Sequence, residues 1–191
     1  MVSRSAASGS PQTQRQRAVA RIDQNAPINF TFDGRSYRGF AGDTLASALL
    51  ANNVHLVGRS FKYHRPRGIM AAGSEEPNAL IRLGKGAYAE PNLRATQIEI
   101  FEGLYAESQN RTPSLKFDIG AINSVLDRFF PAGFYYKTFM WPASMWMRYE
   151  HVIRHAAGLG KVADDHNDPD RYEKTHAHCD ILVAGGGATG L

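Results

Sequence analysis

Cysteine is nearly absent from this chain, which has 191 residues and a single cysteine, Cys179. One thiol excludes an intramolecular disulfide framework and any metal or cluster site that needs four cysteines from this chain. Proteins without disulfides are typical of reducing compartments, so we expect a cytoplasmic protein. The composition is otherwise that of an ordinary globular chain, with 43% hydrophobic and 21% charged residues.

A long uninterrupted apolar run is also missing. Residues 1–17 contain Arg and Ser but no apolar core, so we expect no secretory signal and note only a weak likeness to a transit peptide. Residues 129–147 are rich in aromatic side chains, but Pro131, Lys137 and Pro142 divide them into pieces too short to cross a bilayer. We interpret this segment as core and inter-domain packing, or else as a surface that another subunit or a flavin domain covers.

Most of the chain lacks an excess of either charge. The formal net charge of +4 comes from residues 1–22, which contain four Arg residues and no acid, whereas the rest of the chain holds 18 basic and 18 acidic residues. We expect residues 1–26 to form a disordered basic tail. A basic loop at residues 58–68 mixes four cations with aromatic residues, yet acidic residues follow closely. We therefore expect a structural loop whose Arg residues bridge domains or approach cofactor phosphates, and no nucleic-acid partner.

Residues 27–102 have the pattern of a compact α+β module of the β-grasp type. Alternating apolar and polar residues at 28–32 and 35–40 flank an Asp-Gly turn, which predicts a β-hairpin. Asp43 precedes an amphipathic segment and is expected to cap a helix from about Thr44 to Asn52. Further strands are expected at 54–57, 79–83 and 96–101.

Helical periodicity replaces strand alternation after this module. Residues 103–162 are predicted to form an aromatic-rich helical subdomain, with helices at 119–130 and 144–157. A polar linker is expected at 163–178. Its alternating Asp and Asn residues lack the central Gly and terminal Glu of a calcium loop, so we expect no calcium site there.

The last residues, 179–191, carry the most informative motif. An apolar strand predicted at 180–184 leads into Gly185, Gly187 and Gly190, which have the G-x-G-x-x-G spacing of a dinucleotide-binding turn. The first would form a tight turn, the second would let the backbone approach a pyrophosphate, and the third would let the next helix pack on the strand. We favour this interpretation over a chance Gly-rich turn. The following helix, the other strands and the acidic ribose-binding residue would have to come after residue 191. We therefore expect residues 179–191 to be the start of a truncated Rossmann domain and the chain to be the front end of a longer polypeptide.

Metal-binding patterns are weak by comparison. Segment 176–179 holds two histidines and the cysteine, but no fourth ligand or neighbouring carboxylate is evident, so we favour simple packing of the linker. A plant-type ferredoxin loop needs cysteines spaced C-x4-C-x2-C, and that spacing falls here on Ala71, Glu76 and Ala79. We therefore predict a cluster-free ferredoxin-like module without a metal site. We assign no catalytic residue, since no Ser-His-Asp, Cys-His or paired-carboxylate arrangement is evident.

Several of these segments together resemble the alpha subunits of heterotetrameric sarcosine oxidases. Besides the glycine motif, the resemblance rests on FDGRSY at 32–37, GDTLASALLAN at 42–52, VGRSFKYHRPRGI at 57–69 and PAGFYYKTFMWPAS at 131–144. It spans nearly everything from residue 28 to residue 191. RSFKYHRPRG is its most specific part.

The resemblance implies part of a large flavoenzyme that demethylates sarcosine to glycine, forms hydrogen peroxide and passes the one-carbon unit to tetrahydrofolate. In such enzymes the beta subunit holds FAD, FMN lies between the alpha and beta subunits, and the gamma and delta subunits complete the tetramer. For this chain it implies a role in assembly and NAD binding through Gly185, Gly187 and Gly190. It also implies that there is no iron-sulfur cluster and that the isolated chain is inactive.

Two other hypotheses stay open. The chain could be a stand-alone degenerate ferredoxin-like interaction module, or a fragment of a related amine or opine dehydrogenase subunit. The glycine motif favours an enzyme subunit over a stand-alone module. The dehydrogenases in question keep the cluster cysteines, so Ala71, Glu76 and Ala79 favour the sarcosine oxidase type.

Overall fold

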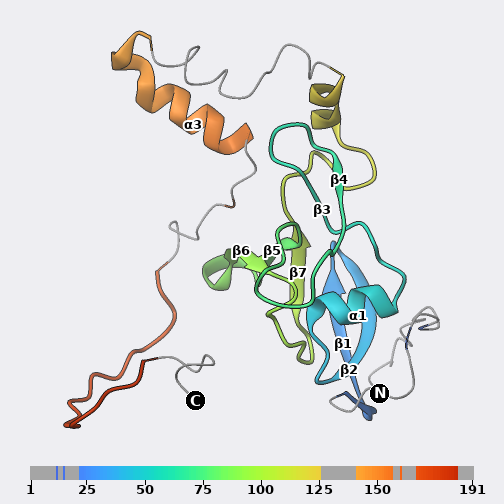
Figure 1. Ribbon diagram of the computed structural model, residues 1–191, viewed down its shortest axis with the longest axis vertical. Helices are drawn as coiled ribbons and strands as arrows, with labels where there is room; N and C mark the ends of the chain where they lie inside the picture. The colour runs from blue at the N-terminus through green and yellow to red at the C-terminus, as the bar shows by residue number, and fades with distance from the viewer. Residues whose placement is uncertain are drawn as a thin grey trace, which may run out of the picture.

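The computed structural model describes Gln12, Arg15 and residues 22–125, 141–156, 160 and 167–184. A five-stranded mixed sheet has the strand order β2-β1-β7-β5-β6, and the helix α1 packs against it beside a separate ribbon of β3 and β4 (Figure 1). The strands are β1 (Asp23–Phe32), β2 (Arg35–Ala41), β3 (Gly58–Arg59), β4 (Pro66–Arg67), β5 (Leu80–Leu83), β6 (Glu90–Arg94) and β7 (Tyr105–Ser108). The helices are α1 (Leu45–Ala51), η1 (Gly86–Tyr88), η2 (Ile119–Ser124), η4 (Ala143–Met145) and α3 (Trp146–Ala156).

The predicted hairpin is confirmed by the antiparallel pair β1 and β2. Asp33 and Gly34 both have positive φ angles, 48° and 75°, as expected for a tight turn that matches the twist of the strands. The disordered tail was predicted to end at residue 26, and this boundary was wrong. Strand β1 already begins at Asp23, which pairs with Ala41. Residues 23–26 therefore belong to the sheet. The part of the tail at 1–11, 13–14 and 16–21 lies outside the described residues.

The predicted helix is also confirmed, although its cap differs. Thr44 is the N-cap, since its Oγ1 accepts the backbone N–H of Ser47 at 3.1 Å. Asp43 was expected to cap the helix but is fully buried one residue earlier, where it accepts the Ser47 hydroxyl at 2.7 Å and the Phe40 N–H at 3.0 Å. The Arg15 guanidinium also pairs with this carboxylate, at 3.1 Å from Oδ1. Arg15 is thus held beside the start of α1.

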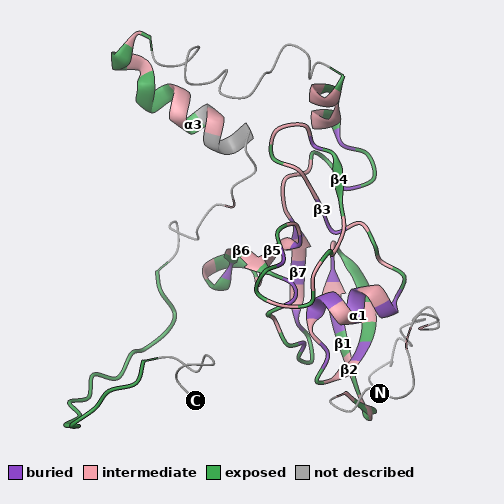
Figure 2. Ribbon diagram, viewed as in Figure 1, coloured by how far each residue is buried: buried purple, intermediate pink, exposed green. Residues whose placement is uncertain are grey.

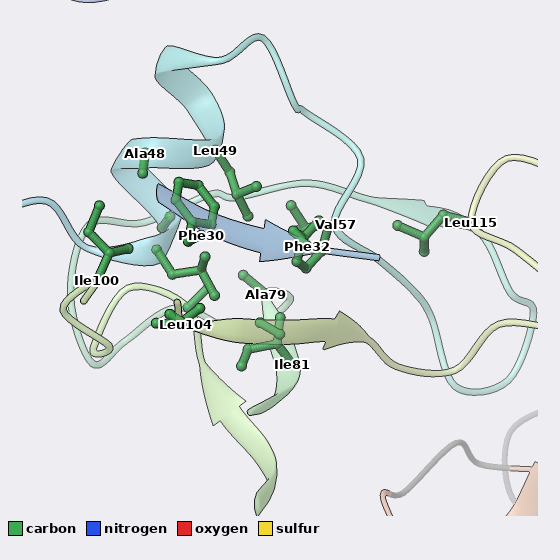
Figure 3. Packing of buried hydrophobic residues seen from close by; sticks show 14 residues of the cluster. Phe30, Phe32, Ala48, Leu49, Val57, Ala79, Ile81, Ile100, Leu104 and Leu115 are labelled. Carbon is green, nitrogen blue, oxygen red and sulfur yellow. The ribbon is translucent and has the colours of Figure 1, made fainter. Parts of the chain in front are cut away.

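The hydrophobic core lies between α1 and the sheet (Figure 3). Burying each of its large side chains contributes roughly 1.5–3 kcal/mol. The largest of these are Phe30, Phe32, Leu45, Leu49, Val57, Ile81 and Leu104, all 2% exposed or less. Val57 and Ala79 belong to this core and hold two points of the segment that runs from α1 to β5.

Two of the strands predicted between residues 27 and 102 were wrong, and four described strands, β3, β4, β6 and β7, were missed. Strand β5 confirms the one expected at 79–83, but segments 54–57 and 96–101 form no strand. The second of these lies beside the start of α1, where its Ile98 carbonyl accepts the N–H of Leu45 at 2.7 Å. Strands β6 and β7 complete the sheet instead. Because β7 pairs in parallel with β1, the purely helical subdomain predicted for 103–162 was wrong at its start.

The described part of the C-terminal third holds few regular elements. The helix expected at 119–130 is a 3-10 helix, η2, as far as the structure describes it, and α3 confirms the one expected at 144–157. Segment 167–184 has neither helix nor strand and is exposed along its length (Figure 2). The buried strand predicted at 180–184 was wrong: Ile181, Leu182 and Val183 are 62–82% exposed, and no other described segment pairs with them. No described helix is long and apolar enough to span a membrane.

Candidate functional site

The ferredoxin-type loop, residues 68–79, closes around the carboxylate of Glu76. This residue is only 1% exposed. Its Oε2 accepts the backbone N–H groups of Met70 at 2.7 Å and Ala71 at 2.6 Å, and its Oε1 accepts that of Asn78 at 2.8 Å. The loop is thus organised around a buried anion that belongs to its own sequence.

The backbone donors keep this carboxylate ionised. Burial by itself raises the pKa of Glu76, but hydrogen bonds from the N–H groups of Ala71, Asn78, Met70 and Ala79 outweigh burial and hold the pKa below its ordinary value of 4.5. The loop therefore stabilises a negative charge at neutral pH.

The residues in this loop do not fit an iron-sulfur cluster. Such a cluster is held by four ligands, usually cysteine thiolates, whereas the C-x4-C-x2-C spacing falls on Ala71, Glu76 and Ala79. The backbone N–H groups of Ala71 and Ala79 instead donate to the carboxylate of Glu76. The chain's one cysteine, Cys179, is exposed in the C-terminal segment.

The basic loop at residues 58–68 forms the β3–β4 ribbon and is bound to the segment after β7. Arg59 points inward, with Nε donating to the Leu115 carbonyl and NH1 to the His64 carbonyl, both at 2.9 Å. The Asn110 amide donates to the Ser60 carbonyl at 2.6 Å. These contacts agree with the prediction of a structural loop.

A buried pair of His64 and Asp118 completes this junction. His64 Nδ1 lies 2.6 Å from Asp118 Oδ2, and Arg59 Nε lies 3.9 Å from the same oxygen. The other oxygen, Oδ1, accepts the N–H groups of Thr112 at 3.0 Å and Gly120 at 3.1 Å. The Asp118 side chain is 0% exposed. Asp118 was not predicted from the sequence, because no motif or short spacing connects it with the basic loop at residues 58–68.

The described surface has two depressions that could admit a ligand. A hollow of about 160 Å³ lies beside the ribbon, with Asn78, Asn92 and Gln109 among its lining residues. A more open groove of about 620 Å³ has both Asp33 and Lys116 in its lining. The charged residues that line the hollow are Arg59 and Arg67, with no acid, and Arg59 is already bonded to the Leu115 and His64 carbonyls, whereas charges of both signs line the groove.

The C-terminal candidates are not assembled into a site among the described residues. Gly185, Gly187 and Gly190 lie outside those residues. His176, His178 and Cys179 are described and exposed, and no group of three metal-binding side chains is found within the described ranges.

One part of the chain matches a known domain family. Residues 25–111 match the family described as a 2Fe-2S iron-sulfur cluster binding domain. This range contains the sheet except the first two residues of β1, together with α1 and the 68–79 loop, so a ferredoxin-like domain is present in the chain. Its loop departs from the family's description, because it has no cysteine.

Comparison with curated proteins is more specific. Over 171 residues the chain is 66% identical to sarcosine oxidase subunit alpha of Rhizobium meliloti (strain 1021), a match that covers 89% of this chain and 17% of that protein. It is 34% identical over 179 residues to sarcosine oxidase subunit alpha of Corynebacterium sp. (strain U-96), covering 92% of this chain and 14% of that protein. The resemblance to sarcosine oxidase alpha subunits is confirmed, and the chain spans less than a fifth of their length.

Among solved structures, L-proline dehydrogenase from P. horikoshii matches with a TM-score of 0.37 and 22% identity, covering 46% of this chain and 16% of that one. Similarity at this level does not define a fold or a function.

Proposed function

We propose that the chain forms the N-terminal part of the alpha subunit of a heterotetrameric sarcosine oxidase. The observation that carries this proposal is the 66% identity to the Rhizobium meliloti subunit across nearly the whole chain. The parent enzyme would demethylate sarcosine to glycine, form hydrogen peroxide and transfer the one-carbon unit to tetrahydrofolate. FAD and FMN would carry the redox chemistry in the parent complex.

Within that enzyme, this segment would serve assembly and NAD binding rather than catalysis. Exposed apolar side chains after the sheet support an assembly role, because Phe117, Ile119, Ile122 and Val125 are 61–80% exposed. They would face the beta, gamma or delta subunits or the rest of the alpha subunit. The spacing of Gly185, Gly187 and Gly190 supports binding of the NAD pyrophosphate to the backbone.

Gene disruption in the source organism tests the proposal. Loss of the gene that encodes this chain should abolish sarcosine-dependent peroxide formation in cell extracts, and the complete gene should restore it. A matched gene copy that lacks codons 25–111 should fail to restore it, because the ferredoxin-like domain is absent. Unchanged peroxide formation in the disrupted strain would refute the proposal. Dye-linked dehydrogenase activity without peroxide would instead support the related amine or opine dehydrogenases.

A further inference from the structure

The backbone of the 68–79 loop directs several N–H groups at one point. Met70 and Ala71 donate to one oxygen of Glu76 and Asn78 donates to the other, all within 2.6–2.8 Å. These donors lie outside the helices and strands of the described chain. Backbone N–H groups that converge in this way form a concavity that favours an anion at its centre.

Contacts that do not involve the Glu76 carboxylate hold the same loop from outside. The Thr96 hydroxyl donates to the Gly73 carbonyl at 2.7 Å. Arg94 Nε donates to the main-chain carbonyl of Glu76 at 3.1 Å. Arg94 is the last residue of β6, and Thr96 follows it by two residues. Because these two side chains hold the loop backbone, part of the arrangement of N–H groups should persist without the carboxylate.

We propose that the 68–79 loop is an anion site built from backbone N–H groups, with the carboxylate of Glu76 as its built-in ligand. A cluster of iron, sulfide and thiolates also carries negative charge and accepts backbone hydrogen bonds. The Glu76 carboxylate thus supplies the negative charge and the acceptors that such a loop requires, at a position where the ferredoxin spacing calls for a cysteine. Removing the side chain should leave a site for a small carboxylate such as acetate. The inference does not depend on the proposed function.

Glu76→Ala in the full 191-residue chain, compared with Glu75→Ala, tests the proposal. Glu75 is the matched control, because it has the same charge one residue away but is exposed. The Glu76 variant should unfold at a lower temperature, and amide hydrogen exchange at residues 70–79 should accelerate by about 10- to 100-fold. Sodium acetate should partly reverse both effects, whereas sodium chloride at equal ionic strength should not. Glu75→Ala removes only the bond from the Gly73 N–H to Glu75 Oε1 at 3.2 Å, so the control should accelerate exchange at Gly73 but not at Met70, Ala71 or Asn78, and the wild-type chain should show neither effect.

The proposal is overturned if both variants behave alike, or if acetate stabilises the two variants and the wild-type chain equally. If Glu76→Ala does not fold, Glu76→Gln provides the same test, because it keeps the side-chain volume but removes the charge and one acceptor. Exchange at 70–79 should then still accelerate relative to Glu75→Gln. Unchanged exchange in Glu76→Gln would also overturn the proposal.

Discussion

Replacing Asp118 with Ala should destabilise the domain more than any exposed substitution. The carboxylate is fully buried and accepts bonds from His64 Nδ1 at 2.6 Å and from the N–H groups of Thr112 and Gly120 at 3.0 and 3.1 Å. Each buried donor left without an acceptor costs about 1–3 kcal/mol, and removal of one partner from a buried pair costs about 3–5 kcal/mol. These costs overlap, so we expect a loss of about 3–5 kcal/mol in the free energy of unfolding.

The assay is urea denaturation followed by circular dichroism, with Asp180→Ala as the exposed control. Asp118→Asn should lie between wild type and Asp118→Ala, because it keeps one acceptor oxygen. In thermal unfolding, the loss corresponds to a fall in Tm of roughly 12–20 °C for a domain of about 100 residues. A loss below about 1 kcal/mol for Asp118→Ala would refute the view that this carboxylate joins the basic loop to the segment after β7.

Two other perturbations probe the core and the 68–79 loop. Gly39→Ala should lower the free energy of unfolding by about 1–3 kcal/mol, because its Cβ would lie 2.4 Å from Ile100 Cδ1. Ile100→Val should offset part of that loss in urea denaturation, and the absence of any offset would contradict the steric explanation. The second perturbation is pH. Because the pKa of Glu76 is lowered in the fold, its contribution to stability is present above pH 4.5 and is lost as pH falls below that value. Urea denaturation across this range should show a weaker pH dependence in Glu76→Gln than in wild type, and an identical dependence would contradict the assignment.

Elements set by local chemistry could be predicted from the sequence. The Asp33-Gly34 turn needs positive φ angles that these residues tolerate, so the hairpin was evident from neighbouring residues. Helix α1 followed from apolar spacing and a capping residue within one turn, although the cap proved to be Thr44. The absence of cysteine from the ferredoxin loop was equally visible in the sequence. These features depend on interactions within a few residues.

Features set by distant contacts could not be predicted. Strand β7 has only four residues, and its role comes from pairing in parallel with β1. Asp118 lies 54 positions from His64, so their pairing exists only in the folded chain. Glu76 was recognised only as a missing cysteine, because the convergence of backbone donors on its carboxylate depends on the path of the whole loop. The apolar run at 180–184 suggested a buried strand, but no described segment covers it.

If the carboxylate of Glu76 takes the place of a cluster in this ferredoxin-like domain, the purified chain should not assemble one. The most direct measurement is the iron and acid-labile sulfide retained by the purified chain after anaerobic incubation with iron and sulfide, followed by desalting. We predict retention no greater than that of a protein without metal sites, and no visible absorbance. Stoichiometric iron and sulfide together with the visible absorbance of a cluster would contradict the claim.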